Sequence, residues 1–163
     1  MLSGQNRLIV PDIVVKPSDL NAGSTWQLLQ WCLESGSNEF SWACLAAISS
    51  EAPFCVAAEK ALEAFSLPPA PRPHLTRPLA KRLIRQTRLW SFNEQSAVIL
   101  RGLLPDGLFT DRQGNRDGWM EDLTLYRSSQ LLLGVITHED RATLRASDAE
   151  IQQLRERGLL PSN

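Results

Sequence analysis

Helical spacing of apolar residues dominates the first half of the chain. Trp26, Leu29, Cys32 and Leu33 recur three or four positions apart, after a capping-box pattern that starts at Ser24 and before a glycine suited to ending a helix. Similar spacing recurs further along, and a second capping box opens a helix near the C-terminus. The pattern predicts helices over residues 24–36, 38–50, 53–65, 77–89 and 147–158.

Alternation of polar and apolar residues becomes prominent in the second half. The clearest example runs from Trp119 to Arg127, and a further apolar run after Ser128 and Ser129 completes an antiparallel hairpin. A strand near the N-terminus is interrupted by Pro11, which predicts a position at a sheet edge. Strands are predicted over residues 7–15, 96–104, 119–127, 130–137 and 141–145.

The order of these elements predicts a fold of the α+β class. Because most helices precede most strands, we expect a helical N-terminal half packed on a small antiparallel β-meander with a C-terminal helix. Residues 1–163 have the length of a single domain. A proline-rich connector at 66–78 joins the two halves. It could fold against the core or pass to a neighbouring copy, so the oligomeric state is left open.

Composition is that of a folded protein. Hydrophobic residues make up 43% of the chain and charged residues 21%, which argues against disorder. The start of the chain lacks the pattern of a secretory leader, and no apolar run is long enough to span a membrane, so a cytoplasmic location without membrane contact is expected. Cys32, Cys44 and Cys55 are interpreted as reduced core residues. The excess of arginine over lysine favours a bacterial source.

Positive charge concentrates in the middle of the chain. Residues 69–101 hold seven basic side chains and one acidic side chain, a net charge of +6, although the whole chain carries −1. On the predicted helix these basic residues form one stripe, which indicates a docking surface for an acidic protein, with a nucleic-acid backbone as the second choice. The alternative is a solvated helix face. The stripe consists of Arg77, Lys81, Arg85 and Arg88 with Arg82 nearby, and the candidate apolar anchors are Trp31, Trp90, Phe92 and Trp119.

Residues 111–118 show a partial likeness to a calcium-binding loop, because an asparagine, an aspartate and a glycine follow one another closely. The alignment fails at its end, since Thr124 would occupy the position of the bidentate glutamate, and two arginines in the loop would oppose a cation. A structural hairpin loop is therefore expected. No metal and no cofactor are predicted for this chain.

His138, Glu139 and Asp140 come directly after a predicted strand, where catalytic residues often lie. Acid–base chemistry is one hypothesis for this triplet, and a polar turn is the other. His74 lies among the prolines of the connector and is expected to be exposed. It could join a metal site only if the fold brought His138 and carboxylates beside it.

The sequence contains no serine-nucleophile elbow and no phosphate-binding glycine loop. We therefore expect a non-enzymatic cytoplasmic protein-binding module, of the adaptor, inhibitor or toxin-neutralising type, that uses the basic helix as its docking surface. Two alternatives stay open. One is a small enzyme with acid–base residues near His138, and the other is a nucleic-acid-binding protein that uses the stripe at 77–88.

Overall fold

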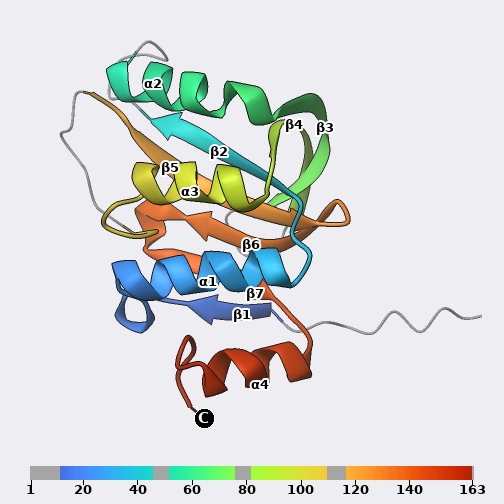
Figure 1. Ribbon diagram of the computed structural model, residues 1–163. Coiled ribbons are helices and arrows are strands. Elements are labelled where there is room, and N and C mark those ends of the chain that lie inside the picture. The colour runs from blue at the N-terminus through green and yellow to red at the C-terminus, as the bar shows by residue number, and fades with distance from the viewer. Residues whose placement is uncertain (1–11, 46–51, 76–81, 110–116, 163) are drawn as a thin grey trace, which may run out of the picture.

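The computed structural model describes residues 12–45, 52–75, 82–109 and 117–162. Within these ranges seven antiparallel strands form one sheet, in the order β1-β7-β6-β5-β2-β4-β3 (Figure 1). None of the helices in the same ranges has both the length and the apolar content needed to cross a membrane. The strands are β1 (Asp12–Val15), β2 (Glu39–Leu45), β3 (Ser66–Leu75), β4 (Arg82–Ser91), β5 (Trp119–Arg127), β6 (Gln130–Ile136) and β7 (Arg141–Arg145). The α-helices are α1 (Ala22–Glu34), α2 (Pro53–Leu62), α3 (Glu94–Leu103) and α4 (Asp148–Glu156), and a short 3-10 helix, η3 (Thr137–Glu139), follows β6.

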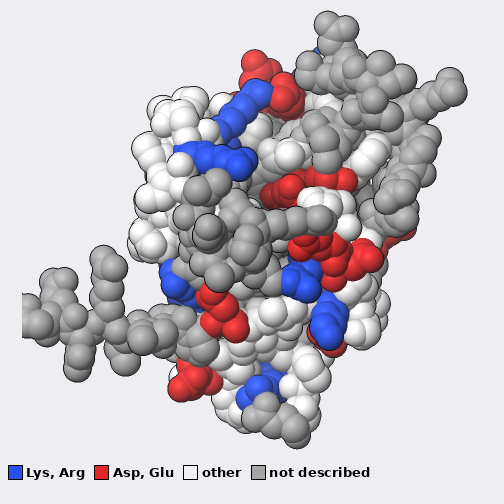
Figure 2. Space-filling view, turned by 180° about the vertical axis from the view of Figure 1, so that it is seen from behind, with Lys and Arg blue, Asp and Glu red and all other residues white. Residues whose placement is uncertain are grey.

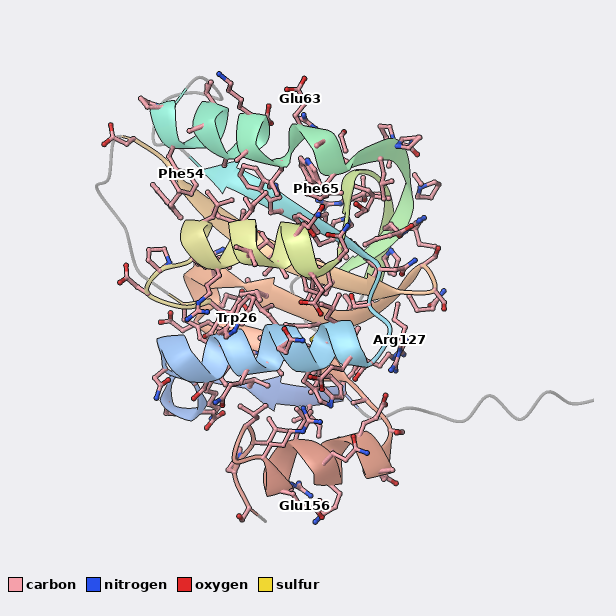
Figure 3. The ribbon with its side chains drawn as sticks, viewed as in Figure 1. Trp26, Phe54, Glu63, Phe65, Arg127 and Glu156 are labelled. Carbon is pink, nitrogen blue, oxygen red and sulfur yellow. The ribbon has the colours of Figure 1, made fainter. Side chains whose placement is uncertain are left out.

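Helices α1, α2 and α3 lie on one face of the sheet, and α4 lies beside the edge strand β1 (Figure 1). The hydrophobic core is packed between these helices and the sheet, where Trp31, Phe40 and Leu125 are almost completely buried. Trp26 lies between α1 and α3 (Figure 3), and the guanidinium of Arg101 covers its ring at 5.0 Å from the ring centre. Burial of this apolar surface is the main favourable contribution to folding.

The hairpin formed by β3 and β4 folds back over the face of the sheet that points away from the core. Strand β3 contacts β6, although three strands separate them in the sheet order. Thr124 pairs with Gly134, and because successive side chains of a strand alternate, Thr124 points away from Leu125 and the core. A Cβ atom at Gly134 would lie 2.7 Å from Cδ1 of Leu75, which is closer than such atoms approach. Glycine at this position therefore permits the hairpin to contact the sheet.

An ion pair also fixes the hairpin. Nε and Nη2 of Arg72 on β3 donate to the two carboxylate oxygens of Glu39 on β2, at 2.8 and 2.9 Å. The two side chains are only 11% and 16% exposed. Two parallel hydrogen bonds between charged groups are stronger and more directional than one, so this pair joins two strands that are not neighbours in the sheet.

Several predicted elements are confirmed. Helix α4 carries the expected capping box, in which Ser147 and Glu150 accept hydrogen bonds from each other's backbone N–H groups. Strands β5 and β6 form the expected hairpin, and β7 follows it. Helices α1 and α2 also lie within their predicted ranges, apart from the first residues of α1, which is capped by Asn21 and not by Ser24.

The predicted fold is wrong in its arrangement. A helical N-terminal half packed on a small β-meander was expected, but the sheet includes strands from the whole length of the chain. The helix expected at 38–50 is strand β2 as far as residue 45, beyond which the structure is not described before residue 52. The helix expected at 77–89 is strand β4 from residue 82 onward. The strand expected at 96–104 is helix α3, and the connector at 66–78 contains strand β3.

Two of these errors come from side-chain spacings that suit a helix as well as a strand. Strand β2 lies in the middle of the sheet, where the successive residues Phe40 and Ser41 are both buried, and a strand buried on both faces cannot be told from a buried helix by periodicity. In β4 the decisive pattern is short, since the buried Thr87 and Leu89 alternate with the exposed Gln86 and Arg88. Buried residues thus recur at every second position, as in a strand, and not at every third or fourth position, as in a helix.

The other two errors concern β3 and α3, where local features of the sequence favour the observed structure. Prolines 71 and 73 alternate along the edge strand β3, so both missing N–H groups can face the open edge while the strand pairs with β4, and Pro68 and Pro69 fall at the register shift between Leu67 and Ala70. Helix α3 begins with a capping residue, because Oδ1 of Asn93 accepts hydrogen bonds from the backbone N–H groups of Gln95 and Ser96. A strand prediction that starts at Ser96 ignores this cap.

The cysteines differ from one another. Cys32 is a buried free thiol, as expected for a reduced core residue. Cys55 is also buried but is disulfide-bonded, so the prediction that it is reduced is wrong. The sulfur to which it is joined lies outside the described side chains.

Replacement of Gly134 by alanine should destabilise the protein by about 1 to 3 kcal/mol, because the new methyl group overlaps Leu75. Gly102→Ala is the matched control, since nothing lies within 4 Å of a Cβ at this helical position. The control should be neutral or slightly stabilising. Urea unfolding followed by circular dichroism measures both, and equal stability of the two variants would contradict the proposed role of Gly134.

Replacement of Arg72 by alanine should lower the free energy of unfolding by about 3 kcal/mol or more, because it leaves a mostly buried Glu39 carboxylate without its partner. Arg88→Ala removes a half-exposed ion pair with Glu59 and a cation–π contact with Trp90, so its cost should stay below about 2 kcal/mol. The comparison uses the same unfolding assay. A loss in Arg72→Ala no larger than that in Arg88→Ala would show that the buried pair does not hold the hairpin.

Candidate functional site

The basic residues chosen from the sequence do not form a helical stripe in the described part of the chain. Arg77 and Lys81 lie outside the described residues, and so does the side chain of Arg82. Arg85 and Arg88 are both exposed on β4, but three positions separate them, so they point to opposite sides of the strand. Figure 2 shows basic and acidic side chains mixed on the face opposite the helices.

The four aromatic residues proposed as anchors are buried or partly buried. Trp31, Trp90 and Phe92 are 1%, 2% and 4% exposed and belong to the core cluster. Trp119 is partly buried, and its Nε1 donates a hydrogen bond to Oε1 of Glu121 at 2.7 Å. Trp119 is thus tied directly to a carboxylate, that of Glu121.

A cavity of about 250 Å³ lies where the β3–β4 hairpin folds over the sheet, and we call it the hairpin cavity. Its polar lining comes from segments that are far apart in the sequence, β3, β4, β5 and η3. Both histidines of the chain contribute to it. The polar lining residues are His74, Arg85, Asp122, Thr124 and His138.

Another cavity of about 250 Å³ lies between α1 and α3. Its lining is mostly apolar, and its one ionisable side chain, Arg101, already covers the ring of Trp26. The hairpin cavity carries more reactive groups for the same volume. We therefore take the hairpin cavity as the candidate functional site.

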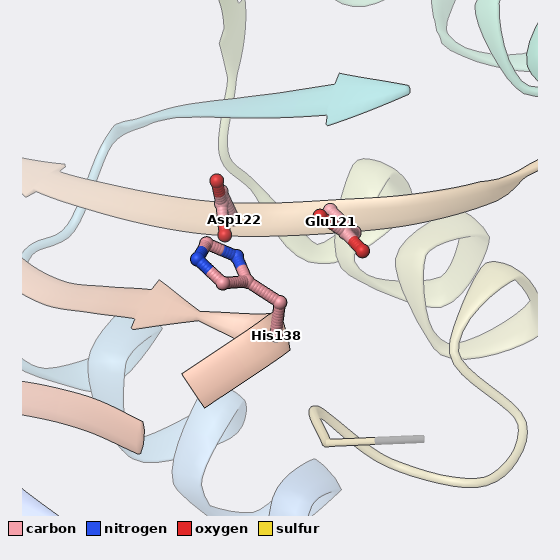
Figure 4. A group of neighbouring side chains, drawn as sticks. All are labelled: Glu121, Asp122 and His138. Atoms are coloured by element: carbon pink, nitrogen blue, oxygen red, sulfur yellow. The ribbon is translucent and has the colours of Figure 1, made fainter. Parts of the chain in front are cut away.

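Of the predicted triplet, only His138 lies at this site. His138 is exposed on η3, and its imidazole is turned toward Asp122 (Figure 4). Glu139 and Asp140 do not line the cavity. The carboxylates beside His138 are instead Glu121 and Asp122 of β5, and one potential ligand atom from each of these three residues lies within 4.8 Å of the others.

A β-bulge explains how two consecutive residues reach the same histidine. Between the paired residues Ser41–Thr124 and Ala43–Glu121, strand β5 contains one residue more than strand β2. The regular alternation of side chains along β5 therefore breaks at Asp122. Asp122 has a φ angle of 51°, in the left-handed region that non-glycine residues seldom adopt. Such backbone conformations cluster at functional sites.

Hydrogen bonds hold this unusual backbone in place. The backbone N–H of Asp122 donates to Oγ1 of Thr137 at 3.0 Å, and the backbone N–H of Thr137 donates to Oδ1 of Asp122 at 3.1 Å. The bulge and η3 are thereby fixed to each other. His138 follows Thr137 directly, so the same pair of bonds sets its distance from the carboxylates.

Glu121 is unusual because it is a carboxylate at 5% exposure. Its Oε1 accepts the hydrogen bond from Trp119, but Oε2 is buried without a hydrogen-bond partner. Burial raises the pKa of Glu121, while the hydrogen bond from Trp119 partly opposes this shift. Two adjacent acidic residues in a strand that is otherwise mostly apolar were a signal for this site, since strict alternation must bury one of them.

His74 is partly buried, against the expectation that it is exposed. Its Nε2 lies 2.6 Å from Oγ1 of Thr87 and 3.4 Å from the hydroxyl of Tyr126. Burial lowers the pKa of His74, and the positive charge of Arg85 lowers it further, while Asp122 acts in the opposite direction. His74 is accordingly neutral at pH 7.

The lowered pKa of His74 makes stability depend on pH. The unfolded chain takes up a proton on this residue more readily than the folded chain, so the contribution of His74 is fully present above about pH 6.5 and is lost as the pH falls below that value. Urea unfolding at pH 7.5 and 5.5 should show a larger loss of stability in the wild type than in His74→Asn, which does not titrate. Equal losses in the two proteins would refute a lowered pKa.

Comparison of the chain with protein-family models, with curated proteins and with solved structures finds no match. Its function must therefore be inferred from the residues and geometry of the hairpin cavity.

Proposed function

We propose that this chain binds a small polar molecule bearing a carboxylate or phosphate group in the hairpin cavity. The observation that carries the proposal is the convergence of His74, Arg85, Asp122 and His138 on one cavity from four separate elements. Binding sites for small molecules typically combine an apolar wall with a few convergent polar groups. The remaining lining, which includes Val135 and Ile136, supplies such a wall.

The charge of the ligand is argued from Arg85. This residue contributes a permanently charged guanidinium to the lining, and guanidinium groups pair bidentately with carboxylate and phosphate. The hydroxyl of Thr124 and the two imidazoles add hydrogen-bonding groups around it. A volume of about 250 Å³ suits a molecule smaller than a typical drug.

This proposal replaces the protein-binding module as the leading hypothesis. The module depended on a basic helix with its cations on one face, and the segment from residue 82 onward is a strand. Binding to an acidic protein or to nucleic acid stays a prediction without support from the described residues. A cytoplasmic location likewise stays a prediction, and the disulfide at Cys55 counts against it because disulfides are typical of oxidising compartments.

The test uses the two histidines as reporters. Because the chain has two histidines and both line the cavity, its imidazole C–H resonances in an NMR spectrum both report on this site. Titration with inorganic phosphate, acetate, succinate and citrate should shift these resonances for at least one compound. That compound should also raise the free energy of unfolding, by about 2.7 kcal/mol at one hundred times its Kd.

Arg85→Gln and Arg88→Gln form the matched pair for this experiment. Both remove an exposed arginine of β4, but Arg85 lines the cavity, whereas Arg88 pairs with Glu59 outside it. The response should disappear in Arg85→Gln and persist in Arg88→Gln. A response that survives in Arg85→Gln, or no response to any of the four anions in the wild type, would overturn the proposal.

A further inference from the structure

We propose that Glu121, Asp122 and His138 bind a divalent transition-metal ion, and that this ion is Zn²⁺. One oxygen or nitrogen ligand atom from each residue lies within 4.8 Å of the others. Figure 4 shows the imidazole of His138 beside Asp122, with Glu121 next to Asp122 along β5. The inference goes beyond the proposed binding of an anion, because it needs neither Arg85 nor His74.

The buried oxygen of Glu121 provides independent support. A carboxylate oxygen that is removed from water and has no hydrogen-bond donor is costly, so most such atoms in proteins have a partner. Oε2 of Glu121 has no hydrogen-bond partner, although the residue is almost completely buried, with 5% of its surface exposed. A cation held between Glu121, Asp122 and His138 would provide the missing interaction.

The surroundings fix the carboxylates as metal sites require. Nε1 of Trp119 holds one oxygen of Glu121, and the backbone N–H of Thr137 holds Oδ1 of Asp122. Groups behind the ligands commonly orient them in this way and raise metal affinity. Each carboxylate thus has one oxygen engaged by the protein.

The ligand types favour zinc over magnesium and calcium. The latter two prefer sites made entirely of oxygen, whereas one imidazole and two carboxylates are within the usual ligand range of Zn²⁺. Tetrahedral zinc at about 2.0 to 2.2 Å from its ligands needs ligand atoms about 3.4 Å apart. Rotation of His138, which is exposed at the surface, can bring its imidazole closer to the two carboxylates. Three protein ligands leave the fourth position for water or for a bound molecule.

Isothermal titration calorimetry with zinc chloride in a non-coordinating buffer tests the proposal. We expect one Zn²⁺ per chain in the wild type, with a shift of the His138 imidazole resonances in the NMR spectrum. Glu121→Gln, Asp122→Asn and His138→Ala should each weaken binding by at least about tenfold, and Trp119→Phe by about tenfold, since it removes the hydrogen bond behind Glu121. Titration with magnesium chloride should give no comparable binding.

Glu139→Gln is the matched control, because it removes a neighbouring carboxylate outside the three-residue group and should leave the affinity for Zn²⁺ unchanged. Absence of zinc binding by the wild type, or an unchanged affinity in Glu121→Gln, would overturn the proposal. Arg85→Gln separates it from anion binding, since this variant should still bind Zn²⁺. Anion binding without zinc binding would refute the metal site alone, and zinc binding without anion binding would refute the proposed function alone.

Discussion

The close contact between the β3–β4 hairpin and the sheet is the constraint on which the candidate site depends. Leu75 of β3 packs against Gly134, where the absence of a side chain lets β3 reach β6. The ion pair between Arg72 and Glu39 also joins β3 to β2. If the hairpin did not fold over the sheet, His74 and Arg85 would lie far from strand β5, which carries Asp122. The cavity is thus a product of how the sheet curls, and not of any single loop.

A second, local constraint places the reactive groups within that cavity. The bulge in β5 breaks the alternation of side chains, so Glu121 and Asp122 both lie near His138. The reciprocal hydrogen bonds between Asp122 and Thr137 offset the cost of the left-handed backbone. Strain, burial of a carboxylate and convergence of imidazoles occur at one place, which is the usual situation at functional sites.

Local signals in the sequence predicted part of this molecule well. Helix α4 and the β5–β6 hairpin were predictable because a capping box and a two-residue turn act within a few positions of one another. Segments such as β2 and β4 were not predictable in this way. Their side chains are apolar or basic at spacings that suit a helix, and only pairing with distant strands makes them strands.

The sequence by itself determined the chemistry that is present: two histidines, a cluster of arginines, and adjacent acidic residues in an apolar strand. His138, Glu139 and Asp140 are all candidates from their place after a predicted strand, but the structure brings only His138 to the cavity. Only the tertiary structure decided that its partners are Glu121 and Asp122, and that His74 and Arg85 line the same cavity. The physical reason is that strand pairing and the folding-back of a hairpin join residues far apart in the chain, and no local pattern records which strands will meet.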